Sequence, residues 1–128
     1  MSRWSEQRPA GRSLGLAYAE YERAHMALVA EVSVNRLKGD LAVHNVWSAV
    51  DCGFALQPDI IRSLMEGGIT QGLSIAMFEE VIVEDGVFQQ SNYHDYRILR
   101  MSECPDVEVN VIKSQRDVAG VAELVDSA

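Results

Sequence analysis

The sequence predicts an α+β domain in which one long helix packs on an antiparallel sheet. Three stretches before residue 53 alternate larger apolar residues with small or polar ones, which is the period of half-buried strands. After Pro58, apolar residues recur at three- and four-residue steps, which is the period of a helix. Asp85-Gly86 then stands between two β-forming runs, and a last alternating run follows. The predicted order is therefore strand, strand, strand, helix, hairpin, strand.

The first three strands are expected to form an antiparallel meander. A polar segment, residues 1–13, precedes them and is expected to be a flexible lead-in. Strands are expected at 14–22, at 25–35 and at 41–53, because valine, leucine and aromatic residues recur there on one face. A turn around Gly39 joins the second strand to the third.

A helix is expected from Pro58 to near Glu80. Proline fits the first turn of a helix, because the N–H that it lacks has no partner there. Gly67, Gly68 and Gly72 lie inside this helix, although each costs roughly 1 kcal/mol relative to alanine. Gly68 and Gly72 share a face and allow close packing on the sheet. Gly67 lies about 100° from Gly68, so we expect a further neighbour to approach that second surface.

A hairpin and a last strand complete the domain, which is expected to span residues 14–114. The hairpin covers 80–92, and Asp85-Gly86 suits its turn because both positions tolerate positive φ. The last strand is expected at 107–114. Residues 115–128 are small and acidic, and we expect them to form an irregular tail.

Charge and hydropathy exclude two classes of partner. The 128-residue chain carries 11 Lys and Arg against 19 Asp and Glu, a net charge of −8, which argues against a nucleic-acid interface. No apolar run approaches the roughly 20 residues that span a bilayer, and the N-terminus lacks the apolar centre of a signal peptide. We therefore expect a cytoplasmic chain that binds neither nucleic acid nor membrane.

The cysteines and histidines do not indicate a metal site. Cys52 and Cys104 form no Cys-x-x-Cys pair, so a zinc or iron–sulfur site would lack thiolates. Two lone cysteines fit a reducing compartment, and the sequence leaves open whether they pair. His25 and His44 lie on strands that can pair, but structural roles are favoured for them and for His94. We predict no metal ligands among these residues.

Several blocks of the sequence resemble a known family. The blocks read VWSAVDCGFALQPDIIRSLMEGGITQGLS, EDGVFQQSNYHDYRILRM and PDVEVNVIKS, and they begin at residues 46, 84 and 105. In this order they resemble the C-terminal part of the molybdenum-cofactor-binding subunit of the xanthine dehydrogenase and aldehyde oxidase family. The branch that they resemble most is the large (beta) subunit of isoquinoline 1-oxidoreductase. The resemblance covers most of residues 11–114.

The resemblance implies a cofactor and an activity. Proteins of this family hydroxylate N-heterocycles or aldehydes with oxygen from water, and hold molybdenum on a pterin dithiolene (molybdopterin). Their electrons pass to a partner subunit that carries iron–sulfur clusters. The family pattern Gln-x-Glu-Gly-Gly, whose glutamine lies against the cofactor, corresponds to residues 64–68. Glu66, Gly67 and Gly68 match and are the cofactor-binding candidates, whereas Leu64 replaces the glutamine.

The resemblance also implies a candidate catalytic base. The family's glutamate follows Gly-Gly-Val-Gly, and here residues 119–123 read AGVAE, which places Glu123 at that position. A complete subunit of this kind is several times longer, so the chain is expected to be a fragment that supplies one wall of the cavity. One wall holds a charged cofactor weakly. We therefore expect no catalysis and no cofactor retention by this chain alone.

Two hypotheses remain open. The first is a molybdenum hydroxylase fragment that acts with iron–sulfur or other subunits. The second is a non-catalytic, self-associating α+β module that keeps only the family's fold. In either case the glycine face of the helix and an open sheet edge are expected to be exposed, which favours a homo-oligomer, most simply a dimer.

Overall fold

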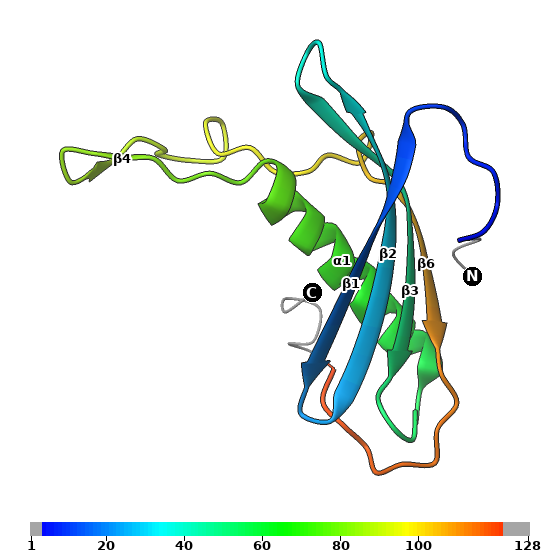
Figure 1. Ribbon diagram of the computed structural model, residues 1–128. Helices are drawn as coiled ribbons and strands as arrows, with labels where there is room; N and C mark the ends of the chain where they lie inside the picture. Colours follow the sequence, from blue (N-terminus) through cyan, green and yellow to red (C-terminus); the bar gives the residue numbers. More distant parts are fainter. Residues whose placement is uncertain (1–3, 122–128) are drawn as a thin grey trace.

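The computed structural model describes residues 4–121, which form a twisted sheet with one helix lying across one of its faces (Figure 1). The elements in chain order are β1 (Arg12–Tyr21), β2 (Ala24–Asn35), β3 (Asp40–Asp51), α1 (Pro58–Met77), β4 (Val83–Glu84), β5 (Val87–Phe88) and β6 (Asp106–Val111). This arrangement confirms the predicted α+β class and the predicted order of elements. Within the described residues, no helix is both long and apolar enough to cross a membrane.

The main sheet has four strands in the order β1-β2-β3-β6. β1 pairs with β2, and β2 pairs with β3, in antiparallel register, which is the predicted meander. β6 instead pairs with β3 in parallel register, from Asn45 opposite Asp106 to Val50 opposite Val111. The direction of β6 follows from the crossover through α1, because a chain that leaves one end of β3 and returns to the other must enter parallel.

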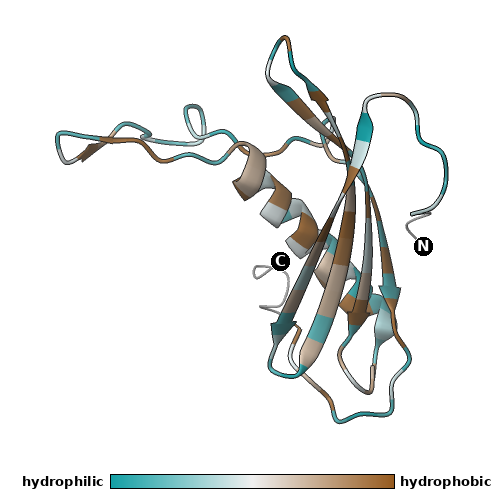
Figure 2. Cartoon of the chain, viewed as in Figure 1, coloured by the Kyte–Doolittle hydropathy of each residue, from teal (hydrophilic) through white to brown (hydrophobic). Residues whose placement is uncertain are grey.

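The core lies between α1 and the face of the sheet that α1 covers. Alternate strand residues reach this face, and α1 adds residues one turn apart. The buried apolar residues that form this core are Ala19, Ala24, Met26, Val46, Val50, Cys52, Met65, Ile69 and Val109. Figure 2 shows apolar residues on α1 and on the strands beside it, and also along an extension beyond α1.

Two buried serines of this core differ in their hydrogen bonding. Ser74 Oγ accepts a hydrogen bond from the Leu99 N–H at 2.9 Å. Ser48 Oγ is buried and has no hydrogen-bond partner among the described residues. An unsatisfied buried hydroxyl costs roughly 1–3 kcal/mol, whereas a satisfied one contributes about 1 kcal/mol.

Ser48→Ala is therefore expected to raise the free energy of unfolding by about 1 kcal/mol, because it removes an unpaired polar atom from the core. Ser74→Ala is the matched control, and is expected to lower it by about 1 kcal/mol because the Leu99 N–H loses its acceptor. Urea denaturation of the two variants checks the pair. Equal losses in both variants would contradict the assignment of Ser48 as unsatisfied.

The segments after β3 follow the predicted elements with shifted ends. The helix ends at Met77 rather than near Glu80, and Ser74 O accepts hydrogen bonds from the N–H groups of both Phe78 and Glu79. Asp85 and Gly86 have φ of 51° and 78°, as the predicted hairpin turn requires. We call residues 79–98, which include this hairpin, the arm. Figure 1 shows the arm extending from the end of α1 away from the sheet.

Candidate functional site

The predicted cofactor-facing residues lie on one side of α1, which we call the glycine flank. Positions three and four residues apart share a helical face. The flank consists of Ile60, Leu64, Gly67, Gly68, Gln71 and Ile75. Its apolar side chains are exposed, with Ile60 at 60%, Leu64 at 41% and Ile75 at 52%. The structure therefore brings Leu64 and Gly67 together on an apolar surface that the rest of the described chain leaves uncovered, and half-buried Gly68 lies at the border of this surface.

The core contacts of α1 come from the adjacent face of the helix. Met65 is 0% exposed and Ile69 is 3% exposed, so these side chains hold the helix on the sheet. A Cβ added at Gly67 or at Gly72 would meet nothing within 4 Å. The expected close packing at Gly72 is thus wrong, because the larger side chains of the core set the distance between helix and sheet. The expected neighbour at Gly67 stays a prediction.

Glu66, the third cofactor-binding candidate, lies apart from Leu64. A two-residue step turns the helix by about 200°, which places Glu66 on the side of α1 that faces β6. Two neighbours on that side, Arg62 and Thr70, define its surroundings: Arg62 Nε donates to the Val109 carbonyl at 3.4 Å, and Thr70 Oγ1 donates to the Glu66 carbonyl at 2.8 Å. The matched motif therefore spreads over two sides of the helix.

Glu123, the candidate base, lies outside the described residues, but residues 116–119 before it are hydrogen-bonded to the end of β3. Phe54 N–H donates to the Arg116 carbonyl at 2.9 Å, and Ala119 N–H donates to the Cys52 carbonyl at 3.0 Å. We call residues 51–54 and 116–119 together the clasp. The clasp places the chain beside the end of β3, so residues 116–119, which form no helix or strand, are hydrogen-bonded next to the core.

Two further contacts support the clasp. Arg116 lies 2.8 Å from Asp51, and its hydrogen bond holds the pKa of that carboxyl below its usual range, with help from the Gly53 N–H. Gly53 has φ of +76°, and a Cβ there would lie 2.0 Å from the Asp117 carbonyl oxygen. This contact was not predicted from the sequence, although the Asp-Cys-Gly triplet after a strand was an available signal.

The histidines and cysteines do not converge. His25 hydrogen bonds to Tyr18 at 2.7 Å, whereas His44 hydrogen bonds to Ser33 at 2.7 Å. No group of three or more His, Cys, Asp or Glu side chains within residues 4–121 could hold a metal ion. Both cysteines are free, and burial raises the pKa of the Cys52 thiol, which disfavours a nucleophilic role.

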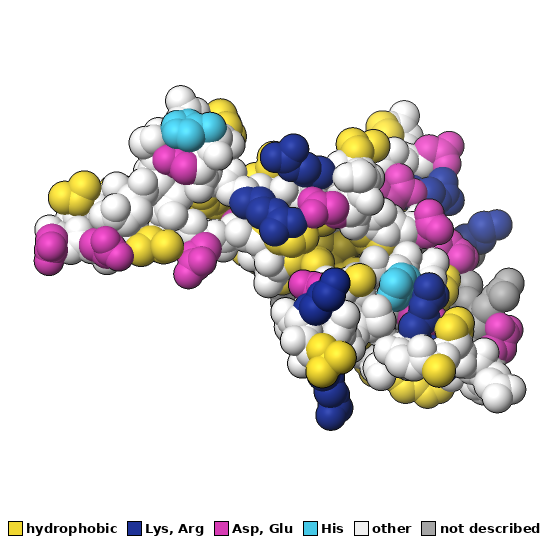
Figure 3. Space-filling view, turned by 90° about the horizontal axis from the view of Figure 1, so that it is seen from above, with side chains coloured by type: hydrophobic (Ala, Val, Ile, Leu, Met, Phe, Trp, Pro, Cys, Tyr) yellow, Lys and Arg dark blue, Asp and Glu magenta, His cyan; other side chains and the backbone are white. Residues whose placement is uncertain are grey.

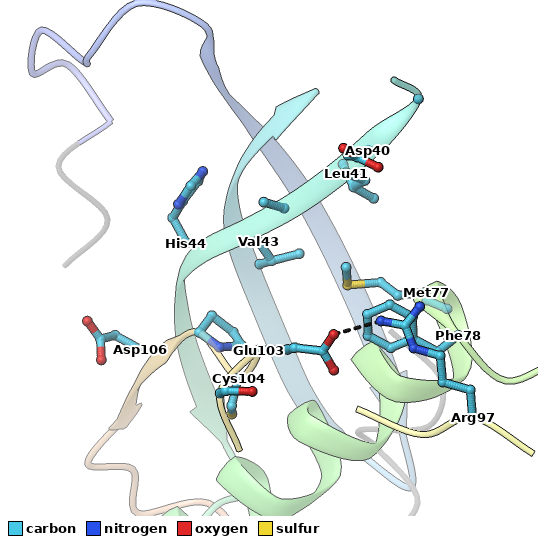
Figure 4. A pocket seen from close by; sticks show the side chains of 15 residues that line it. Asp40, Leu41, Val43, His44, Met77, Phe78, Arg97, Glu103, Cys104 and Asp106 are labelled. Atoms are coloured by element: carbon cyan, nitrogen blue, oxygen red, sulfur yellow. Dashed lines mark hydrogen bonds and ion pairs between the residues drawn. The ribbon is translucent and has the colours of Figure 1, made fainter. Parts of the chain in front are cut away.

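A cavity of about 660 Å³ lies at the C-terminal end of α1, between the start of β3 and the segment before β6. Figure 4 shows its labelled side chains, including Arg97, which forms an ion pair with Glu103 at 2.6 Å and lies over the Phe78 ring. None of the cofactor-binding candidates lines it. Its carboxylates, Asp40 and Asp106 among them, also make it a poor match for an anionic cofactor.

The glycine flank offers a molybdopterin group open space beside the main chain but few polar partners. Gly67 leaves the main chain open to a flat group, and Gln71 supplies an exposed amide. Leu64 offers no hydrogen bond, and no Lys or Arg belongs to the flank. Because a phosphate-bearing cofactor needs many polar partners, these residues are suited to one wall of a larger site.

Comparison with known proteins gives the relatives of this chain. Residues 4–105 match a family model described as molybdopterin cofactor-binding domain. The chain is 51% identical, over 127 residues, to the beta subunit of isoquinoline 1-oxidoreductase from Brevundimonas diminuta. It is 30% identical, over 114 residues, to a nicotinate dehydrogenase subunit from Pseudomonas putida. These matches cover 97% and 83% of this chain, but only 16% and 10% of the two relatives.

Solved structures share the fold. Quinoline 2-oxidoreductase from Pseudomonas putida 86 matches 80% of this chain and 14% of its own, with a TM-score of 0.73 and 24% identity. The aldehyde oxidoreductase from Desulfovibrio desulfuricans matches 80% of this chain and 12% of its own, with a TM-score of 0.69 and 22% identity. The resemblance inferred from the sequence blocks is confirmed. The chain belongs to the molybdopterin cofactor-binding domain family of the xanthine dehydrogenase and aldehyde oxidase group, and it spans a small part of the proteins that it matches.

Proposed function

We propose that the chain forms one wall of the molybdopterin site of a molybdenum hydroxylase, and that it is inactive without the other walls. The reaction would be hydroxylation of an N-heterocycle or aldehyde with oxygen from water, with electrons passing to an iron–sulfur partner. The observation that carries the proposal is the 51% identity over 97% of the chain to one part of an isoquinoline 1-oxidoreductase subunit.

The proposal gives separate roles to the residues of this chain. Gly67 and Gly68 leave the helix main chain open to the cofactor, and the Gln71 amide orients it. The cofactor, when bound, supplies the oxidation–reduction chemistry. Glu123 would accept a proton from water at its carboxylate, and the clasp would position residues 116–119 before it.

The alternative function is that of a self-associating module. It is favoured by the exposed Ile60, Leu64 and Ile75 side chains and by the position of β1 at the edge of the sheet. Light scattering of the purified chain separates the two proposals. The module would be favoured if the purified chain is a dimer that Leu64→Asp dissociates into monomers, and if the chain binds no molybdenum under any condition.

A chimera tests the proposed function directly. The matching segment of the Brevundimonas diminuta subunit is replaced by this chain, and the product is made with its partner subunits in cells that synthesise the molybdenum cofactor. We expect molybdenum near one atom per chimera and oxidation of isoquinoline with an artificial electron acceptor. A folded chimera without molybdenum would overturn the proposal.

Leu64→Gln is expected to change the free energy of unfolding of this chain by no more than about 0.5 kcal/mol, because Leu64 is 41% exposed and outside the core. In the chimera the same change is expected to raise the molybdenum content after dialysis, because it restores an amide to the flank. Thermal unfolding and metal analysis give the two readings. A loss of stability above about 1 kcal/mol would instead place Leu64 in a buried contact.

A further inference from the structure

The arm exposes a dense set of apolar side chains. Outside the hairpin pairing of β4 with β5, it extends from the body without packing on the sheet (Figure 1). Phe88 is 69% exposed and Tyr93 is 85% exposed. The other exposed large apolar residues of the arm are Val81, Ile82, Val83, Val87 and Ile98. Such a density of exposed apolar side chains marks an interaction surface.

The arm is nevertheless organised by its own hydrogen bonds. Gln89 N–H donates to the Ile82 carbonyl at 2.9 Å, which extends the hairpin. Asp95 closes the following turn by accepting from the N–H groups of Ser91 and Asn92, each at 2.9 Å. These two bonds lower the pKa of Asp95 to about 2, so the turn is closed at neutral pH. The apolar surface is therefore built before any partner binds.

A slot lies within this surface. It has a volume of about 380 Å³ and is lined by Val81, Phe88, Gln90, Asn92, Tyr93 and Tyr96. Tyr96 donates from its hydroxyl to Glu79 at 2.8 Å and so ties the far side of the slot to the first residue of the arm. The volume and the mixed lining suit one large apolar or aromatic side chain with polar contacts at its rim.

The charge of the arm restricts its partner. The arm contains five acidic residues, Glu79, Glu80, Glu84, Asp85 and Asp95, and one basic residue, Arg97, which forms an ion pair with Glu103 outside the arm. Figure 3 shows carboxylates between apolar side chains along the outer part of the arm. A complementary surface therefore combines an apolar anchor with Lys or Arg. A second copy of this chain, with a net charge of −8, fits that description poorly.

We propose that the arm is a docking surface for the remainder of a cofactor-binding subunit of this family, which places an apolar side chain in the slot and basic side chains around it. The related subunits contain this remainder, because the chain covers only 16% and 10% of them. The inference rests on the proposed function, in which this chain works beside those other walls. The docking role concerns the arm, whereas the proposed function concerns the glycine flank.

A two-piece experiment tests the docking. The Brevundimonas diminuta subunit lacking the matching segment is co-expressed with this chain, and the affinity of the purified pieces is measured at two salt concentrations. We expect Phe88→Asp to weaken binding at least about tenfold, because hot-spot residues lie in such slots. Leu37→Asp, at a residue that is 98% exposed on the β2–β3 turn, is the control and is expected to change binding less than about twofold.

If the subunit that lacks the matching segment does not fold alone, the covalent chimera tests the docking role instead. There Phe88→Asp is expected to lower the melting temperature well below that of the Leu37→Asp chimera. Equal affinities and equal melting temperatures for the two variants would overturn the docking role, as would a dimer of this chain that Phe88→Asp dissociates. Molybdenum bound by the unsubstituted chimera would still support the proposed function in that case, so the two failures are distinguishable.

Discussion

Gly53→Ala is expected to lower the free energy of unfolding by about 3 kcal/mol or more. Gly53 adopts φ of +76°, where a non-glycine residue costs on the order of 1–3 kcal/mol. The added Cβ would also lie 2.0 Å from the Asp117 carbonyl oxygen, so the main chain of the clasp must move. Overpacking of this kind costs a further 1–3 kcal/mol or so. Urea denaturation of the purified chain measures the change.

Gly15→Ala is the control for this substitution. Gly15 lies exposed in β1, and a Cβ there would meet nothing within 4 Å. Its effect is expected to stay within about 1 kcal/mol, because alanine is tolerated in a strand. If Gly53→Ala proved as mild as Gly15→Ala, the clasp would not hold residues 116–119 against the end of β3.

Met65→Ala is expected to lower the free energy of unfolding by about 2–5 kcal/mol. Met65 is 0% exposed between α1 and the sheet, so its truncation leaves a cavity in the core. Leu64→Ala removes a side chain of similar size from the adjacent position of the same helix. Its cost is expected to stay below about 1 kcal/mol, because Leu64 is 41% exposed.

Thermal and urea unfolding of both variants checks which side of α1 faces the core. Comparable losses of unfolding free energy for Met65→Ala and Leu64→Ala would mean that the glycine flank is buried in the isolated chain. Self-association is one way in which the flank would become buried. Light scattering of the same samples identifies that case directly, because a dimer has twice the mass of the single chain.

Local periodicity was enough to predict most of the fold. Alternation along β1, β2 and β3 and the Asp85-Gly86 turn are properties of neighbouring residues, so they can be read from sequence. The parallel pairing of β6 was not predicted, because an alternating strand looks the same in either direction. The clasp was missed for a related reason. Its hydrogen bonds join Cys52 to Ala119, which are distant in sequence and carry no shared pattern.

The candidate site was predictable in part. The helical period separated the glycine flank from the core face, and the structure agrees for Gly67. The helical period did not show that Gly72 would have free space around it. That space depends on how far Met65 holds the helix from the sheet. The motif match grouped Glu66 with the flank, although a two-residue step from Leu64 turns the helix to its other side.

The molybdenum content of the chimera with Gly67→Phe tests the central claim most directly. In this chain alone the substitution is expected to be tolerated, because a Cβ at Gly67 meets nothing within 4 Å and alanine or larger residues favour a helix over glycine. In the chimera the phenyl ring would occupy the space into which the cofactor enters. We predict a folded protein with at least tenfold less molybdenum than the unsubstituted chimera, whereas Leu37→Phe leaves the metal content unchanged. Full molybdenum occupancy in the Gly67→Phe chimera would contradict the claim that the cofactor lies against the glycine flank.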